Sequence, residues 1–444
     1  MRKLVEKNVP YKAHHHSRRP PLGVDLKFSL EMPTAPRAGL SRIWRDFGAT
    51  YAANGFIGWL FAVTAPVAII LSVGSRGGLS EAEIASWVFG VFFFNGLISI
   101  IFCWLYREPL VFFWTIPGTV LVGPSLAHLS FPEVIGAFYL TGLLMFVLSI
   151  TGWVRSAMAA VPMPVVMGMV AGVFLRFGLD LVRALHDDIA IAGPTVVTWV
   201  LLSVRPTLGR RMPPLIGALL VGVGAAIIGE RFDAGTFATL EFIEPVIQAP
   251  AWSWGAMIEL VVPLAITVLV VQNGQGVAVL RAVGHQPPVN AITAACGIGS
   301  IIGAVFGGIS TCLTGPTNAI IISSGERSRH YTAGIFVGLL ALVFGLLAPT
   351  FTRFLLDAPE AFVMTLAGLA LLKILQAAFT TCFSGRFTLG ALVAFLVTVA
   401  DLPLFNVGAA FWGLVAGILA SWLLERADFS SDRQQTKQTG SARR

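Results

Sequence analysis

Two short stretches decide the fold, namely Phe112-Phe113-Trp114-Thr115-Ile116-Pro117-Gly118-Thr119 and Ser310-Thr311-Cys312-Leu313-Thr314-Gly315-Pro316-Thr317-Asn318. In each, an extended stretch leads to a Pro beside Gly and Thr, and a short apolar run follows. Pro is tolerated in the first turn of a helix, and the residue before it is pushed to extended geometry. We therefore predict that each stretch forms a short strand followed by a half-helix.

The predicted half-helices are too short to cross a bilayer. A helix of about 12 residues covers only ~18 Å of the ~30 Å hydrocarbon core. Each would begin near the middle of the membrane, where its free N–H groups and positive dipole end suit an anion. Pro and Gly can also simply kink an ordinary membrane helix, but two breaks at matching places favour a central binding site.

The rest of the chain is typical of a membrane protein. Of its 444 residues, 56% are apolar and 12% are charged, whereas soluble proteins average about 25% charged residues. The apolar residues form long blocks, as a membrane-crossing helix requires. The blocks do not alternate polar and apolar side chains as barrel strands do. We predict an all-α polytopic membrane protein.

We count 14 candidate crossings. They lie near residues 47–73, 83–105, 110–128, 132–152, 161–183, 189–203, 213–229, 255–280, 288–308, 310–324, 331–349, 358–379, 387–400 and 406–424. An acidic break divides them into seven plus seven, and an odd number in each half makes the two repeats inverted. The predicted parts are a basic N-terminal tail (1–46), a first repeat (47–230), an extracytoplasmic linker (231–254), a second repeat (255–426) and a C-terminal tail (427–444).

The basic residues predict the orientation. The net charge is +7, and 24 of the 30 Lys and Arg residues fall in the two tails and in the loops on the same side. Cytoplasmic loops carry such an excess, so we expect both termini in the cytoplasm and the protein in the inner membrane. This distribution indicates topology and not nucleic-acid binding.

Polar residues inside apolar segments supply further candidates for a substrate site. Gln272, Asn273 and Gln275 lie in the eighth segment, and Tyr51 and Asn54 in the first. Amides can donate hydrogen bonds to a carboxylate without adding charge, although contacts between helices alone would also explain them. The candidates at the two breaks are Thr115, Pro117, Gly118, Thr119, Thr314, Gly315, Pro316, Thr317 and Asn318, with the backbone N–H groups of Gly118, Thr119, Thr317 and Asn318 as expected donors. For an aromatic wall we favour Phe113 over its neighbours.

Other classes of protein find little support in the sequence. The Gly297-Ile298-Gly299 stretch follows no βαβ pattern, and there is no Walker-type loop, so no nucleotide cofactor is expected. An enzyme would need an intramembrane nucleophile or metal-ligand set, and a channel would need continuous polar stripes along several helices. The sequence shows neither pattern.

The third, eighth and tenth segments resemble the benzoate/proton symporter family. The similar stretches are Thr115–Thr119, Val271–Val277, Phe306–Ile309 and Thr314–Ala319. The resemblance implies a fold shared with nucleobase symporters and sulfate-type anion transporters, in which a core domain (segments 1–4 and 8–11) moves against a gate domain (5–7 and 12–14), usually in a homodimer. It implies proton-coupled uptake of benzoate or a similar small aromatic carboxylate, with a nucleobase or sulfate-type carrier as the alternative.

The sequence departs from the nucleobase branch at the expected site. Those carriers place acidic residues in segments 8 and 10, whereas this chain offers amides and threonines there. The absence of acids fits a negatively charged substrate. Because Glu259 falls near the outer end of segment 8, we do not expect a central carboxylate to couple the proton. The proton would travel on the substrate itself or on a residue nearer the gate.

Overall fold

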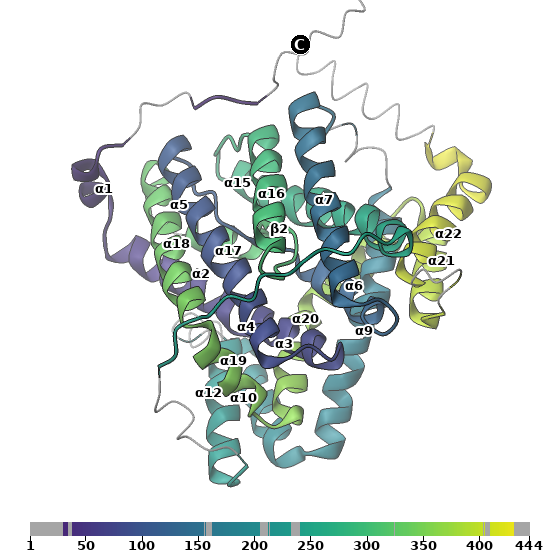
Figure 1. Cartoon of the computed structure of the whole chain (residues 1–444), viewed down its shortest axis with the longest axis horizontal. Coiled ribbons are helices and arrows are strands. Elements are labelled where there is room, and N and C mark those ends of the chain that lie inside the picture. The colour runs from purple at the N-terminus through teal and green to yellow at the C-terminus, as the bar shows by residue number, and fades with distance from the viewer. Residues whose placement is uncertain are drawn as a thin grey trace, which may run out of the picture.

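The computed structural model describes residues 30–33, 38–154, 156, 162–204, 212, 214–231, 240–323, 325–402, 404 and 409–429. These residues form a bundle of helices around one small sheet, with β2 among α15, α16 and α17 (Figure 1). The first half contains α1 (Leu40–Asp46), α2 (Ala49–Val63), α3 (Ala65–Arg76), α4 (Glu81–Phe89), η1 (Gly90–Phe94), α5 (Asn95–Tyr106), β1 (Phe112–Trp114), α6 (Ile116–Ser125), α7 (Phe131–Thr151), α9 (Met163–Asp187), α10 (Ile189–Val204) and α12 (Pro214–Ile228).

The second half begins with one long helical run. It consists of α13 (Trp254–Ala256), η3 (Met257–Val261), α14 (Val262–Ile266), η4 (Thr267–Asn273) and α15 (Gly274–Ala282). There follow α16 (Val289–Ala304), β2 (Thr311–Leu313), α17 (Gly315–Ile321), η5 (Arg327–Arg329), α18 (His330–Leu346), α19 (Ala348–Leu356), α20 (Glu360–Phe383), α21 (Thr388–Ala400) and α22 (Ala409–Leu424).

Among the described residues, seven helical stretches are long and apolar enough to cross a membrane: Ala49–Arg76, Glu81–Tyr106, Phe131–Thr151, Met163–Asp187, Trp254–Ala282, Arg327–Leu346 and Glu360–Phe383. Five further apolar helices, α10, α12, α16, α21 and α22, are shorter. The helical, polytopic character predicted from composition is thus confirmed. The number of 14 crossings and their inverted arrangement stay predictions.

Each of the two decisive stretches is a three-residue strand followed by a short helix. Helix α6 has 10 residues and α17 has 7, and both carry Pro in their first turn. At 1.5 Å per residue these helices are about 15 Å and 10 Å long, somewhat shorter than the sequence suggested. Because β1 pairs antiparallel with β2, both helices start beside the same sheet.

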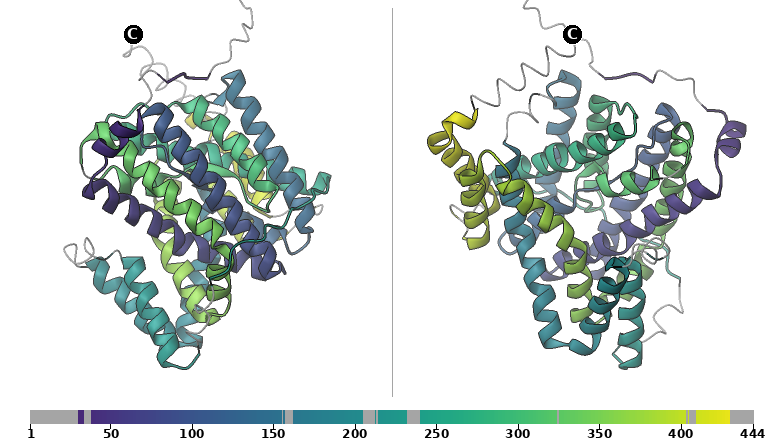
Figure 2. Two further views of the ribbon diagram at one scale, coloured as in Figure 1. Left: turned by 60° about the vertical axis from the view of Figure 1, so that its left-hand side comes forward. Right: turned by 180° about the vertical axis from the view of Figure 1, so that it is seen from behind.

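The helices pack mainly as two groups. One group contains α9, α10, α12, α20, α21 and α22, and the other contains α2, α4, α5, α7 and α15–α18. In Figure 2, α10 and α12 stand side by side at one edge of the molecule. Small residues allow the closest approaches within each group: a Cβ on Gly297 of α16 would lie 2.7 Å from the carbonyl oxygen of Gly142 on α7. Such contacts are typical of helix packing in lipid.

The linker between the halves is an extended strap that crosses elements of both halves and is visible at the front of Figure 1. Residues 232–239 are outside the described part, and residues 240–253 are extended. The strap is held by backbone hydrogen bonds from Ile243 N to Leu346 O (2.9 Å), from Gln248 N to Val305 O (2.8 Å) and from Ala251 N to Pro132 O (2.8 Å). It therefore ties together the ends of α16 and α18 and the start of α7.

The end of the predicted N-terminal tail is part of the folded body. Trp104 Nε1 donates to Ala38 O (2.9 Å), and Arg329 Nε donates to Asp46 O (2.7 Å). The Glu31 carboxylate accepts from the backbone N of Asn290 (2.9 Å), at the start of α16, where a negative charge is stabilised by the helix dipole. Residues 1–29 and 34–37 lie outside the described residues.

Candidate functional site

The two strands bring both breaks together. Phe112 is paired with Leu313, Phe113 with Cys312 and Trp114 with Thr311. The pairing continues into the helix caps, because Thr115 N donates to Ser310 O (3.0 Å) and Thr314 N donates to Val111 O (3.2 Å). Two segments that lie almost 200 residues apart in sequence thus form one junction, from which α6 and α17 depart.

Thr115 caps the start of α6. Its Oγ1 accepts from Gly118 N (3.1 Å) and donates to Thr267 Oγ1 on η4 (3.1 Å), while Thr119 N and Thr119 Oγ1 both donate to Thr115 O (2.9 Å each). All of these groups are buried. The N–H groups of Gly118 and Thr119, expected to be free for an anion, already donate within the protein: the N-cap hydroxyl of Thr115 accepts from Gly118 N, and the Thr115 carbonyl accepts from Thr119 N as the first bond of the helix.

Asn318 ties α17 to the strand before α6. Its Nδ2 donates to Val111 O (2.9 Å) and to Thr314 O (2.6 Å), and its Oδ1 accepts from Val111 N (3.1 Å). The side chain is fully buried, and Asn318 N donates to Thr314 O at 3.4 Å. The amide of Asn318 therefore holds the junction together and is not directed at a ligand in this structure.

Three residues that the sequence analysis did not select complete the junction. Ser99 Oγ on α5 accepts from Phe112 N (2.8 Å), and Ser300 Oγ on α16 accepts from Thr311 N (2.9 Å). Asn95 Oδ1 accepts from Thr311 Oγ1 at 2.7 Å. The signal available in the sequence was weak, because single Ser and Asn residues in apolar helices usually bond to their own backbone. Strand β1 is thereby bonded to α5, and β2 to α16.

Two amides of the eighth segment, Asn273 and Gln275, reach the second break. Asn273 Oδ1 accepts from Leu313 N (2.7 Å), and Asn273 Nδ2 donates to Cys296 Sγ (3.5 Å). Gln272 is buried. Gln275 is exposed and lies against Gly315, where an added Cβ would be 2.6 Å from its Cδ. Gln272 and Asn273 end η4, a π-helix, which is a form frequent at functional sites, and Gln275 lies in the first turn of α15.

The remaining candidates occupy different places. Tyr51 OH accepts from Glu326 N (2.8 Å), and its ring lies under the Arg329 guanidinium, so Tyr51 contacts the loop after α17 and not the breaks. Asn54 is buried one turn further along α2. Gly58 of α2 lies close to the second break, with a hypothetical Cβ 3.2 Å from Thr317 Cγ2. The aromatic ring of Phe113 packs on Phe92 and Trp114, with centroid distances of 5.4 and 5.8 Å.

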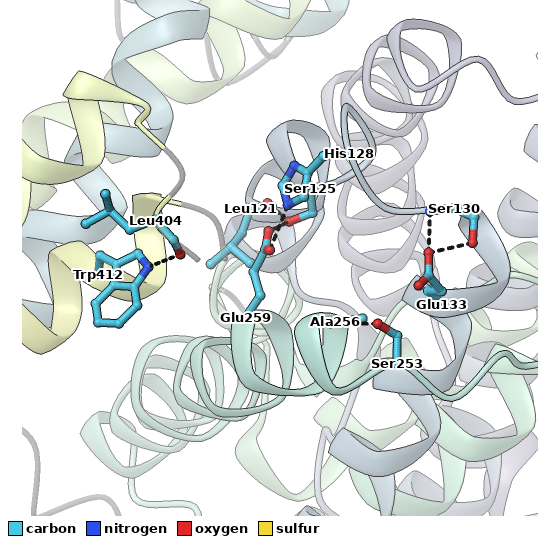
Figure 3. A network of polar contacts seen from close by, with 10 residues as sticks. All are labelled: Leu121, Ser125, His128, Ser130, Glu133, Ser253, Ala256, Glu259, Leu404 and Trp412. Carbon is cyan, nitrogen blue, oxygen red and sulfur yellow. Dashed lines mark hydrogen bonds and ion pairs between the residues drawn. The ribbon is translucent and has the colours of Figure 1, made fainter. Parts of the chain in front are cut away.

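A cavity of about 290 Å³ lies beside the C-terminal half of α6. Its walls come from both helix groups: the ends of α3 and α6 and the start of the eighth segment on one side, and α9, α21 and α22 on the other. Glu259, on η3, lines this cavity and is buried, with 3% of its surface exposed. Ser125 Oγ donates to Glu259 Oε1, and His128 Nε2 lies 2.9 Å from Glu259 Oε2 (Figure 3).

The fold indicates the class of protein: two broken segments whose short helices begin inside a bundle of apolar helices are typical of secondary transporters. The structure superposes on the transmembrane domain of a cyanobacterial bicarbonate transporter, BicA, with a TM-score of 0.57 and 16% identity, covering 84% of this chain and 98% of that one. It also superposes on SLC26A9, with a TM-score of 0.59 and 14% identity, covering 91% and 72%. At these identities the likeness concerns the fold.

The family is shown by the sequence. Residues 46–423 match the family described as benzoate membrane transport protein, so the chain belongs to that family. It is 26% identical over 392 residues to the benzoate membrane transport protein of Acinetobacter baylyi, covering 87% of this chain and 98% of that protein. It is 28% identical over 367 residues to the inner membrane protein YdcO of Escherichia coli, covering 82% and 93%. The chain is therefore a polytopic membrane transporter and not an enzyme.

Proposed function

We propose that the protein is a secondary active transporter that takes up benzoate, or a similar small aromatic carboxylate, together with a proton. The observation that carries this proposal is the β1–β2 junction, which sets the N-terminal ends of α6 and α17 beside the amides of the eighth segment. Helix N-terminal ends favour anions, and neutral amides add donors without a repelling charge. The name of the Acinetobacter relative agrees with this substrate.

The substrate-binding residues in this proposal are those of the junction and its surroundings. Thr115, Pro117, Gly118, Thr119, Thr314, Gly315, Pro316, Thr317 and Asn318 shape the two helix starts. Asn273 and Gln275 lie beside the second, and Gln272 is the buried neighbour of Asn273. Because several of their polar groups are already bonded within the protein, direct contacts to the carboxylate fall first to Gln272 and Gln275. The ring would lie against apolar residues near Phe113.

Transport would follow alternating access between the two helix groups. In this scheme the group containing the junction moves as a core against the group of α9, α10, α12 and α20–α22, which forms the gate. In this proposal the protein lies in the inner membrane with both termini in the cytoplasm. Its 14 crossings form two repeats of seven that are inverted relative to each other, and the assembly is a homodimer. The inner-membrane relative from Escherichia coli supports the location.

Counterflow in proteoliposomes tests the substrate. Vesicles loaded with unlabelled benzoate should exchange it for labelled benzoate at a rate above that of protein-free vesicles. The uptake of labelled benzoate into protein-free vesicles must be subtracted because neutral benzoic acid crosses a bilayer by itself. Parallel vesicles loaded with uracil or sulfate should show no exchange of their own labelled substrate. Exchange of uracil or sulfate without exchange of benzoate would instead establish the alternative, a nucleobase or sulfate-type carrier.

A pair of Gln variants tests the position of the site. Gln272→Ala should weaken benzoate binding about 10- to 100-fold, because a lost hydrogen bond to a charged group costs about 1.5–3 kcal/mol. Gln376→Ala is the matched control, since Gln376 is an exposed amide on α20, in the other helix group. Equal affinities for the two variants, measured by titration at equal expression, would show that Gln272 takes no part in binding.

A further inference from the structure

The inference concerns Glu259 and rests on the proposed proton-coupled uptake. Glu259 belongs to the membrane-spanning stretch Trp254–Ala282 and is buried. An ionisable side chain at such a place is costly and marks a substrate path or a proton relay. Its carboxylate is held by two side chains from outside its own helix, Ser125 at the end of α6 and His128 in the turn that follows (Figure 3).

The partner of Glu259 distinguishes it from Asp401, which also lines the cavity, and from Asp180, which pairs with two arginines of the cavity wall. Asp180 lies 2.9 Å from Arg76 and 3.0 Å from Arg183, and Asp401 lies 3.7 Å from Arg176. Arg remains charged at all physiological pH values, so these pairs keep their charges. His changes its charge near neutral pH. Among the described carboxylates that line this cavity, Glu259 is therefore the one held by a partner that can itself exchange a proton.

The pair is also open to a proton from one side. The His128 side chain is 20% exposed and that of Glu259 is 3% exposed, so the imidazole connects the surface to the buried carboxylate. The titratable and charged groups around Glu259 are His128 in the turn before α7, Glu133 on α7, Arg76 on α3, Arg176, Asp180 and Arg183 on α9, and Asp401 after α21. Glu133 caps the start of α7 through Ser130.

Helix α6 links this pair to the proposed substrate site. Its first turn is capped by Thr115 at the strand junction, and its last residue, Ser125, donates to Glu259. The helix is about 15 Å long, so a shift at one end is transmitted by a rigid element to the other. The opposite cavity wall is formed by α9, α21 and α22 of the gate group. The pair thus lies where the two groups meet and where their movement would open or close access to it.

The geometry points to Glu259, with His128, as the site that takes up the coupled proton. With a neutral imidazole the pair carries one negative charge, and one proton from the outer solution neutralises it. That proton is held between the Glu259 carboxylate and His128 Nε2 while the outer side is open, and it is released to water after the cavity closes and the inner side opens. One benzoate anion and one proton together move no net charge.

Two transport assays on the same vesicles test this assignment. Glu259→Gln keeps an acceptor for the Ser125 hydroxyl but cannot take up a proton. We expect it to exchange benzoate by counterflow at equal pH on both sides. After subtraction of protein-free vesicles, its initial rate of net uptake should be the same with and without an imposed pH gradient. The unchanged protein and the Asp401→Asn control should both be accelerated by the gradient.

The outcomes separate this inference from the proposed function. If the unchanged protein shows no benzoate counterflow, the proposed function is wrong. If it does, and Glu259→Gln still responds to the gradient, the assignment of Glu259 is overturned. If Glu259→Gln fails to fold, the His128→Gln variant tests the assignment instead. We expect the pH dependence of its gradient-driven benzoate uptake to shift, while benzoate counterflow remains. A pH profile of uptake identical to that of the unchanged protein would overturn the assignment of Glu259 and His128.

Discussion

Replacing Asn318 tests whether side-chain hydrogen bonds hold the two broken segments together. Asn318→Ala removes the acceptor of Val111 N and the donor to Val111 O and Thr314 O. Both carbonyls keep a second donor, since Thr314 N reaches Val111 O at 3.2 Å and Asn318 N reaches Thr314 O at 3.4 Å. The main cost is therefore the buried Val111 N–H, which loses the acceptor that Asn318 provides.

The size of the effect follows from these contacts. A buried donor without an acceptor costs about 1–3 kcal/mol, and truncating a fully buried side chain adds a cavity term. Side-chain hydrogen bonds inside membrane proteins are weaker than this on average, about 0.6 kcal/mol and at most about 1.7. Combining these values, we expect Asn318→Ala to lower the free energy of unfolding by about 2–4 kcal/mol.

The assay is equilibrium unfolding of purified protein by SDS in mixed micelles, followed by circular dichroism. Thr141→Ala is the matched control, because Thr141 is equally buried but its hydroxyl donates only to Ala137 O of its own helix. Thr141→Ala should lower the free energy of unfolding by no more than about 1 kcal/mol. If the two variants differ by less than about 0.6 kcal/mol, Asn318 does not hold the junction in the way described.

Two further predictions use the same assay. Ser99→Ala and Ser300→Ala should each lower the free energy of unfolding by about 1–3 kcal/mol, because each leaves a strand N–H without its side-chain acceptor. Values near zero for both variants would mean that water or a shifted backbone replaces the hydroxyls. Gly297→Ala should lower the free energy of unfolding by about 1–3 kcal/mol, because the added methyl group overpacks α7 against α16. Gly224→Ala has open space around the added Cβ and should leave the free energy of unfolding unchanged or raise it by up to about 1 kcal/mol. A larger loss of stability for Gly224→Ala than for Gly297→Ala would contradict the described packing.

Much of the fold could be predicted from the sequence because the signals are local. A Pro beside Gly and Thr restricts its own neighbours, so the strand and short helix at Thr115–Thr119 and at Thr314–Asn318 follow from adjacent residues. Long apolar blocks indicate membrane helices for the same reason. The family resemblance was carried by similarly short stretches around the breaks and at Gln272–Gly276.

The use of individual polar groups could not be predicted in this way. The sequence suggested that the N–H groups of Gly118 and Thr119 would be free, yet Thr115 occupies both of them. Tyr51 seemed as good a candidate as Asn54, yet it contacts the loop at Glu326. Whether a donor is free depends on which acceptor lies within about 3 Å of it, and such distances are set by the packing of segments far apart in the chain.

The sequence by itself determined that this chain crosses a membrane with two broken segments that belong together, because backbone restriction by Pro and burial of apolar blocks act over a few residues. Only the tertiary structure decided that the breaks meet as one antiparallel sheet, that Ser99 and Ser300 cap it, and that Glu259 meets His128 at the cavity beside α6. Hydrogen bonds are short and directional. The pairing of Glu259 with His128, 131 residues apart, therefore exists only once the helices that carry them have packed.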